Sequence, residues 1–219
     1  MKQQNHFEST LRDRKATRFG PARIAVRNTL VDGWSLGAAL LRSPREVGAI
    51  LPSGRFLADA MAREIAHGDG LVVELGGGTG SITAGLLRAG IASNKLVIIE
   101  RDPQLCGRLR RRFPACTIVR GDARELQALL QHSGIADPVK AVVSALPILT
   151  MNRDDQDSFL REALRTGSGG PLIQFTYGLR CPVPAELLAR HGAAAKRRTW
   201  IWQNLPPASV WRIEQTQVA

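Results

Sequence analysis

The segment Leu71–Ser81, which reads LVVELGGGTGS, constrains the fold more than any other part of the chain. A short apolar run ends in Glu74, four glycines follow, and an apolar-periodic segment begins after Ser81. This order predicts a buried strand, a tight turn and a helix start, the opening unit of a parallel α/β sheet. Glycine adopts backbone angles closed to other residues and lets a ligand approach the main chain. Because helix N-terminal amides carry partial positive charge, we expect this turn to bind a nucleotide-like cofactor.

The spacing within the turn narrows the choice of cofactor. The dinucleotide fingerprint has a glycine where this chain has Ser81, and the lysine of a phosphate-binding P-loop is absent. An acidic residue followed by alternating glycines remains: Glu74, Gly76, Gly78 and Gly80. This pattern resembles the first motif of the Rossmann-like S-adenosylmethionine methyltransferases. The resemblance implies S-adenosylmethionine as cofactor and S-adenosylhomocysteine as its product. A structural glycine turn or another nucleotide is the alternative.

Composition indicates the kind of partner. The formal net charge is +11 and the isoelectric point is about 10.9, which favours an anionic partner, either nucleic acid or a lipid surface. The alternative is a basic protein that is merely soluble. Three cysteines without CxxC spacing predict free thiols in a reducing compartment and no metal site. No apolar run approaches the ~20 residues that span a bilayer, and the first residues are too polar for a signal peptide. We therefore expect a cytoplasmic protein.

Residues 1–44 differ in character from the rest. Apolar residues recur there every three to four positions, Trp34 among them, and arginines edge the stripe. This pattern predicts a basic amphipathic helical extension, typical of a membrane-interface element. The alternative is a helix that packs its apolar stripe on the following domain. We expect that domain, an S-adenosylmethionine-dependent methyltransferase domain, to cover residues 45–219.

Strand and helix patterns alternate after the glycine turn. Strands are predicted at Leu96–Ile99, Cys116–Val119, Lys140–Val143 and Leu172–Phe175, and a final antiparallel hairpin at Lys196–Trp202 and Ser209–Ile213. Such a hairpin fits the methyltransferase sheet, whose last strand runs against the others. The expected fold is therefore α/β and Rossmann-like, with a seven-stranded, mostly parallel sheet and a C-terminal antiparallel hairpin.

Two further acidic residues follow predicted strands. Glu100 stands about 20 residues beyond the glycine turn, where a carboxylate can accept hydrogen bonds from both ribose hydroxyls. The methyltransferase resemblance implies that Asp122 bonds the adenine amino group, whereas capping of the next helix is the alternative. The full set expected at the cofactor is Ser53, Glu74, Gly76, Gly78, Thr79, Gly80, Ser81, Glu100, Arg101, Asp122, Ala123 and Ser144.

The loop Ser144–Pro147 follows the fourth predicted strand. Reacting atoms lie beyond the carboxyl ends of the central strands in this architecture, so this loop should face the sulfonium methyl. Base-amine methyltransferases have Asn or Asp at its start and an aromatic residue after the proline, whereas this chain has Ser144 and Ile148. The sequence SALP resembles the SGLP-type motif of soluble bacterial phospholipid N-methyltransferases. The loop expected at Leu51–Gly54 resembles their LPSS-type loop, and Tyr177-Gly178 resembles their Tyr-Gly after the fifth strand.

The resemblance to the soluble, membrane-associating bacterial phosphatidylethanolamine N-methyltransferases covers most of the chain from Arg45 onward. It implies stepwise methylation of the phosphatidylethanolamine amine toward phosphatidylcholine, and attachment to the anionic cytoplasmic face of the inner membrane. The residues expected to act on the acceptor are Tyr177, Ser144, Leu146 and Pro147, with Arg55 and Arg180 as partners of the lipid phosphate.

Two rival functions share the basic charge of the chain. An rRNA adenine methyltransferase would share the cofactor site as well, but Ile148 replaces its base-stacking aromatic residue. A non-catalytic membrane- or RNA-binding methyltransferase relative is the second rival, and the presence of Glu74, Glu100 and Asp122 argues against lost cofactor binding. Nucleic acid is therefore not the expected partner, and the sequence does not determine the oligomeric state.

Overall fold

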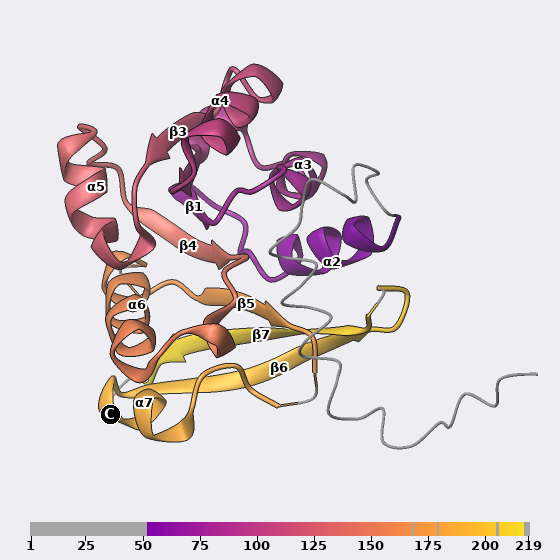
Figure 1. The fold of residues 1–219 in the computed structure, drawn as a ribbon, viewed down its shortest axis with the longest axis vertical. Helices are drawn as coiled ribbons and strands as arrows, with labels where there is room; N and C mark the ends of the chain where they lie inside the picture. Colours follow the sequence, from indigo (N-terminus) through magenta and orange to yellow (C-terminus); the bar gives the residue numbers. More distant parts are fainter. Residues whose placement is uncertain (1–51, 168, 179, 205, 217–219) are drawn as a thin grey trace, which may run out of the picture. The chain divides into compact units, whose positions relative to one another are not determined.

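A computed structural model describes residues 52–216 of the chain, apart from residues 168, 179 and 205, and contains one seven-stranded sheet (Figure 1). The spatial order of the strands is β3-β2-β1-β4-β5-β7-β6. The strands are β1 (Leu71–Leu75), β2 (Leu96–Glu100), β3 (Thr117–Arg120), β4 (Val139–Ser144), β5 (Leu172–Thr176), β6 (Ala193–Ile201) and β7 (Ala208–Gln215). Strands β1 to β5 pair in parallel, and β7 runs antiparallel to both β5 and β6. The predicted fold class is confirmed.

Helices cover both faces of the sheet (Figure 1). One face packs against α2 (Pro52–Ala62), α3 (Ser81–Arg88) and α4 (Pro103–Arg112). The opposite face packs against α5 (Leu126–His132), α6 (Arg153–Thr166) and α7 (Ala185–Arg190). Three short 3-10 helices complete the described elements: η1 (Ser93–Lys95), η2 (Ala123–Glu125) and η3 (Ile148–Thr150). Because both faces are covered, β1, β2 and β5 are buried along their whole length, as their apolar runs predicted.

The start of α2 corrects a prediction. Residues 52–54 were expected as a loop, but Pro52 is the first residue of α2. Proline suits the first helical turn because its missing N–H would have no partner there. Within this helix Phe56 is 47% exposed, whereas Leu57 and Met61 are buried. Helix α7 was not predicted, and the extension 1–44 with its boundary at residue 45 lies outside the described residues.

Helices α2 and α3 meet at a glycine. A Cβ atom added to Gly85 would lie 2.3 Å from the Cβ of Ala58 and 3.1 Å from its carbonyl carbon. Ala58 is fully buried, so no open space would receive the added methyl group. The absence of a side chain at Gly85 therefore permits the close packing of α3 against α2. In the described part of the chain, no helix is both long and apolar enough to cross a membrane.

We expect Gly85→Ala to destabilise the fold by about 1–3 kcal/mol, because the overpacked helices must separate. Gly107, inside α4, is the matched control, since a Cβ there would meet only the flexible end of Arg111 at 3.7 Å. Gly107→Ala should instead stabilise the fold by about 0.5–1 kcal/mol, because glycine in a helix costs conformational entropy. Urea unfolding of both variants measures the two effects, and equal shifts would contradict the packing argument.

Candidate active site

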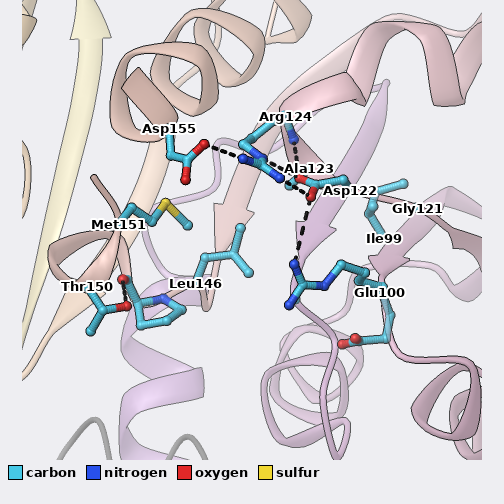
Figure 2. A pocket seen from close by; sticks show the side chains of 13 residues that line it. Ile99, Glu100, Gly121, Asp122, Ala123, Arg124, Leu146, Thr150, Met151 and Asp155 are labelled. Carbon is cyan, nitrogen blue, oxygen red and sulfur yellow. Dashed lines mark hydrogen bonds and ion pairs between the residues drawn. The ribbon is translucent and has the colours of Figure 1, made fainter. Parts of the chain in front are cut away.

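A cavity of about 310 Å³ opens at the carboxyl ends of the central strands (Figure 2). Seven of its lining residues were predicted: Gly76, Glu100, Arg101, Asp122, Ala123, Leu146 and Pro147. Six were not: Ile99, Gly121, Arg124, Thr150, Met151 and Asp155. The structure thus brings together the turn after β1, the end of β2, the loop after β3 and the loop after β4. This is the edge where ligands of open parallel sheets bind.

The glycine turn forms one wall of the cavity. Gly76, Gly78 and Gly80 have φ angles of 79°, 53° and 82°, in the left-handed region that favours glycine. A Cβ on Gly76 would lie 2.7 Å from Cδ2 of Leu146, across the cavity wall. At Gly80 a Cβ would lie 2.4 Å from Cε2 of Phe113. Because Gly76 has no side chain, its main chain stays accessible to a ligand on this side of the cavity.

Thr79 and Ser81 flank the start of α3, outside the residues that line the cavity. Their hydroxyl oxygens lie 3.2 Å apart, and the guanidinium of Arg112 donates a 2.6 Å hydrogen bond to the Thr79 carbonyl. Helix α4 thus stabilises the glycine turn through Arg112. The predicted cofactor contacts of Gly78, Thr79, Gly80 and Ser81 stay predictions.

Glu100 joins the end of β2 to the glycine turn. Its Oε2 accepts a 2.8 Å hydrogen bond from the Gly78 amide, and its Oε1 accepts one of 2.8 Å from the Asp102 amide. The side chain is only 8% exposed, yet it lines the cavity. Each carboxylate oxygen has two acceptor positions, so one on each stays available. Glu100 is therefore fixed in orientation and able to receive ribose hydroxyls.

Asp122 is held by Arg124, as Figure 2 shows. Arg124 Nε donates to Oδ1 of Asp122 at 3.0 Å, and its Nη2 donates to Oδ2 at 2.7 Å. The Arg124 amide also donates to Oδ1, so Asp122 caps η2 as the alternative interpretation proposed, and it lines the cavity as well. The guanidinium hydrogen bonds hold the pKa of the Asp122 carboxyl below its usual range. Arg124 Nη1 reaches on to Asp155.

Buried polar side chains form hydrogen bonds with the main chain of the loop after β4 and stabilise it. Ser144 is fully buried, and its Oγ accepts a hydrogen bond from the Leu146 amide at 3.2 Å. Gln174 Nε2 donates to the Leu146 carbonyl at 3.0 Å, and Gln156 Nε2 donates to the Ile148 carbonyl at 3.0 Å. Leu146 and Pro147 line the cavity as predicted, but Ser144 does not. In this structure Ser144 shapes the loop, and its predicted contact with the reactants stays a prediction.

Tyr177 lies just after β5 and is not a lining residue. Its ring packs edge-on against Phe175, with 5.4 Å between centroids, in the core cluster that also contains α2. Burial raises the pKa of Tyr177, and an interaction with the Asn204 side chain partly offsets this rise. The structure therefore places Tyr177 at the carboxyl edge of the sheet but does not bring it into the cavity.

Arg55 and Arg180 also lie outside the cavity lining. Arg55 is exposed and pairs with Asp59 at 3.8 Å, and Arg180 is exposed. Ser53 falls in the first turn of α2. Their predicted roles toward the lipid phosphate and the cofactor stay predictions.

Glu74 lies within β1, beneath the glycine turn. It is fully buried, and its Oε2 accepts a 2.7 Å hydrogen bond from the hydroxyl of Thr83 in α3. Its Oε1 has no hydrogen-bond partner among the described residues. Burial raises the pKa of Glu74 to about 8, so the group is neutral at pH 7. Glu74 thus links β1 to α3, and it is not a lining residue of the cavity.

Comparison with known proteins agrees with this geometry. Residues 72–169 match the family model described as a methyltransferase domain. The described part of the chain has the fold of a class I S-adenosylmethionine-dependent methyltransferase domain, and the match supports S-adenosylmethionine as the cofactor. The glycine wall and the open acceptor positions of Glu100 fit an adenosyl group. The described residues contain no group of His, Cys, Asp and Glu that could hold a metal ion.

The chain is similar to an ornithine lipid N-methyltransferase from Singulisphaera acidiphila, a curated relative. The two are 33% identical over 119 residues, which is 52% of this chain and 62% of that relative. Among solved structures, N-methyltransferase NodS from Bradyrhizobium japonicum has a TM-score of 0.61 at 13% identity, over 85% of this chain and 100% of that one. TrmN from Thermus thermophilus has a TM-score of 0.59 at 23% identity, over 80% of this chain and 53% of that one. These two likenesses concern the fold alone.

The buried carboxyl of Glu74 should make folding stability depend on pH. Between about pH 4.5 and 8 the unfolded chain has this carboxyl ionised and the folded protein has it protonated. Stability is therefore lost as the pH rises through that window. Glu74→Gln keeps an oxygen acceptor for Thr83 and has no proton to release. Its stability relative to the parent protein should increase steadily from pH 5 to pH 8 in urea unfolding, and parallel profiles would contradict a neutral buried Glu74.

Proposed function

We propose that this protein is an S-adenosylmethionine-dependent phospholipid N-methyltransferase that methylates the amine of phosphatidylethanolamine and of its mono- and dimethyl forms. The observation that carries the proposal is the aliphatic wall of the cavity on the side of the β4 loop. Leu146, Pro147 and Met151 form this wall, and none of the lining residues in the described part of the chain is aromatic (Figure 2). Ile148, where base-amine methyltransferases have a stacking ring, is only 2% exposed. The wall therefore favours an aliphatic amine over a planar base.

The curated relative supports a lipid acceptor, since its name states that it methylates an ornithine lipid. The chain spans 62% of the length of that relative, so the acceptor of the whole protein is part of the proposal. The net charge of +11 supports attraction to an anionic membrane surface at the cytoplasmic face. The extension 1–44 is the segment proposed to attach there.

Methyl transfer requires a deprotonated amine next to the methyl donor. Bound S-adenosylmethionine supplies an electrophilic methyl group: the amine lone pair forms the new N–C bond as the C–S bond breaks, and the proton leaves to solvent. A primary ammonium that titrates near ~10.4 costs roughly 4–5 kcal/mol to deprotonate at neutral pH. Apolar surroundings at Leu146, Pro147 and Met151 lower that cost because they disfavour the charged ammonium. The chain's main contribution is then alignment of the two reactants.

A methyl-transfer assay tests the proposal. The full chain is incubated with methyl-labelled donor and three acceptors in separate arms: phosphatidylethanolamine vesicles with phosphatidylglycerol, ornithine lipid in the same vesicles, and RNA. We expect label in phosphatidylethanolamine, recovered as mono-, di- and trimethyl products by mass spectrometry. Glu100→Gln, prepared identically, should lose the activity because the new amide nitrogen cannot accept one of the two hydrogen bonds from the Gly78 and Asp102 amides, and this excludes a contaminating enzyme.

The other arms decide between the rivals. Label in RNA alone would replace the proposal with a nucleic-acid methyltransferase. Label in ornithine lipid alone would keep a lipid amine as acceptor and overturn phosphatidylethanolamine. Binding of S-adenosylhomocysteine with no label in any arm would favour a non-catalytic relative.

Tyr177→Phe tests the predicted role of the hydroxyl at the end of β5. If that hydroxyl orients the amine, turnover should fall by between about 10- and 100-fold, because misalignment of the reactants is costly. Affinity for S-adenosylhomocysteine, measured by calorimetry, should stay unchanged, since Tyr177 does not line the cavity. Unchanged turnover would remove Tyr177 from the acceptor site. A parallel loss of thermal stability and turnover would reduce its role to the Asn204 contact.

A further inference from the structure

We propose that Arg124 is a positioning residue for the cofactor: anchored on Asp155, its guanidinium holds Asp122 so that one carboxylate oxygen meets the adenine amino group. This inference rests on the proposed function, because it takes S-adenosylmethionine as the ligand of the cavity. Neither Arg124 nor Asp155 belongs to the sequence motifs that predicted the site. Both line the cavity, and Figure 2 shows Arg124 between the two carboxylates.

The hydrogen bonds at Asp122 leave one acceptor position open. Oδ1 accepts from both the amide and Nε of Arg124, each at 3.0 Å, which uses both of its lone pairs. Oδ2 accepts from Arg124 Nη2 at 2.7 Å. The next cation, Arg101 Nη1, lies 4.0 Å from Oδ2, beyond hydrogen-bond length. The remaining lone pair of Oδ2 can therefore receive an N–H donor such as the adenine amino group.

Asp155 gives Arg124 a second, fixed anchor. Arg124 Nη1 donates to Oδ1 of Asp155, in the first turn of α6. Oδ2 of Asp155 accepts a 3.1 Å hydrogen bond from the side chain of Asn152, the residue that caps α6. The Asp155 amide in turn donates to Oδ1 of Asn152 at 2.8 Å. The guanidinium is thus held at both ends, by η2 and by α6, which fixes its plane and the plane of the Asp122 carboxylate.

The charged groups around Asp122 predict how the arrangement responds to pH. Arg124 from η2 and Arg101 from the end of β2 face Asp122 as cations, and Glu100 and Asp155 line the same cavity as acids. Arg124 lowers the pKa of Asp122, so the carboxylate stays an acceptor as the medium becomes acidic. Removal of the Arg124 side chain should therefore raise the pKa of Asp122. Protonated Asp122 is a weaker acceptor for an amino group, so cofactor affinity should then be lost at higher pH.

The test measures binding of S-adenosylhomocysteine to the full chain by calorimetry across a pH series. Arg124→Gln keeps the backbone amide that caps η2 and removes only the guanidinium. It should weaken affinity by about tenfold at pH 7, the scale of a lost hydrogen bond to a charged group. The midpoint of the acid loss of affinity should move to higher pH. Arg124→Lys, which retains the charge without the planar fork, should recover part of the affinity and return the midpoint toward that of the parent.

Asp155→Asn and Arg190→Gln complete the design. Asp155→Asn removes the second anchor and should weaken affinity less than Arg124→Gln does. Arg190→Gln breaks the 2.9 Å ion pair between Arg190 of α7 and Asp157 of α6, neither of which lines the cavity, and should change neither affinity nor its pH profile. Thermal unfolding without ligand separates loss of fold from loss of binding.

The outcomes are distinct. No binding by the parent protein would refute the proposed function itself. Binding by the parent with unchanged affinity in Arg124→Gln would overturn the inference alone. A weaker affinity with an unmoved pH midpoint would also overturn it, because the bridge would then be structural only.

Discussion

The Glu100 carboxylate is the interaction on which the candidate site depends. It accepts the amides of Gly78 and Asp102, so one side chain joins the turn after β1 to the segment after β2. The turn can approach Glu100 only because its glycines adopt left-handed angles. The Gly76 amide completes the junction by donating to the Ile99 carbonyl at 2.9 Å. The sequence predicted that Glu100 contacts the cofactor. In the structure Glu100 also stabilises the glycine turn that forms one wall of the cavity.

The sequence predicted the fold and half of the cavity because those features follow from local patterns. Apolar runs identify buried strands, and Glu100 and Asp122 follow two of them directly. Arg124 and Asp155 lie 31 residues apart, and neither local spacing nor composition indicates that they meet. The polar residue within the apolar strand LIQFT was a usable signal for Gln174, because a buried amide needs a partner. Its partner, the Leu146 carbonyl, depends on how β4 and β5 pair.

The loop Ser144–Pro147 after β4 shows the same difference between what a sequence motif predicts and what only the fold reveals. The motif SALP predicts Leu146 and Pro147 at the acceptor, and in the structure both residues line the cavity. The motif does not reveal that Gln156 and Gln174 use their amide groups to hold the loop's carbonyl oxygens. Each glutamine leaves its own Oε1 buried without a hydrogen-bond partner among the described residues, which costs folding energy. A rigid loop would suit the proposed catalysis by alignment, because alignment requires that the apolar wall of the cavity not move.

Three acidic residues were predicted at the cofactor, Glu74, Glu100 and Asp122, and the structure places them in different environments. Glu74, enclosed by β1 and α3, is neutral at pH 7 because burial outweighs its single hydrogen bond from Thr83. Asp122 remains a carboxylate because Arg124 contributes a bidentate pair at the edge of the cavity. Glu100 lies between them in the fold and receives only backbone amides. A carboxylate can accept from a ribose hydroxyl or an amino group, whereas a protonated carboxyl competes as a donor. We therefore propose Glu100 and Asp122 as the acids that recognise an adenosyl group, whereas Glu74 links β1 to α3 beneath the glycine turn.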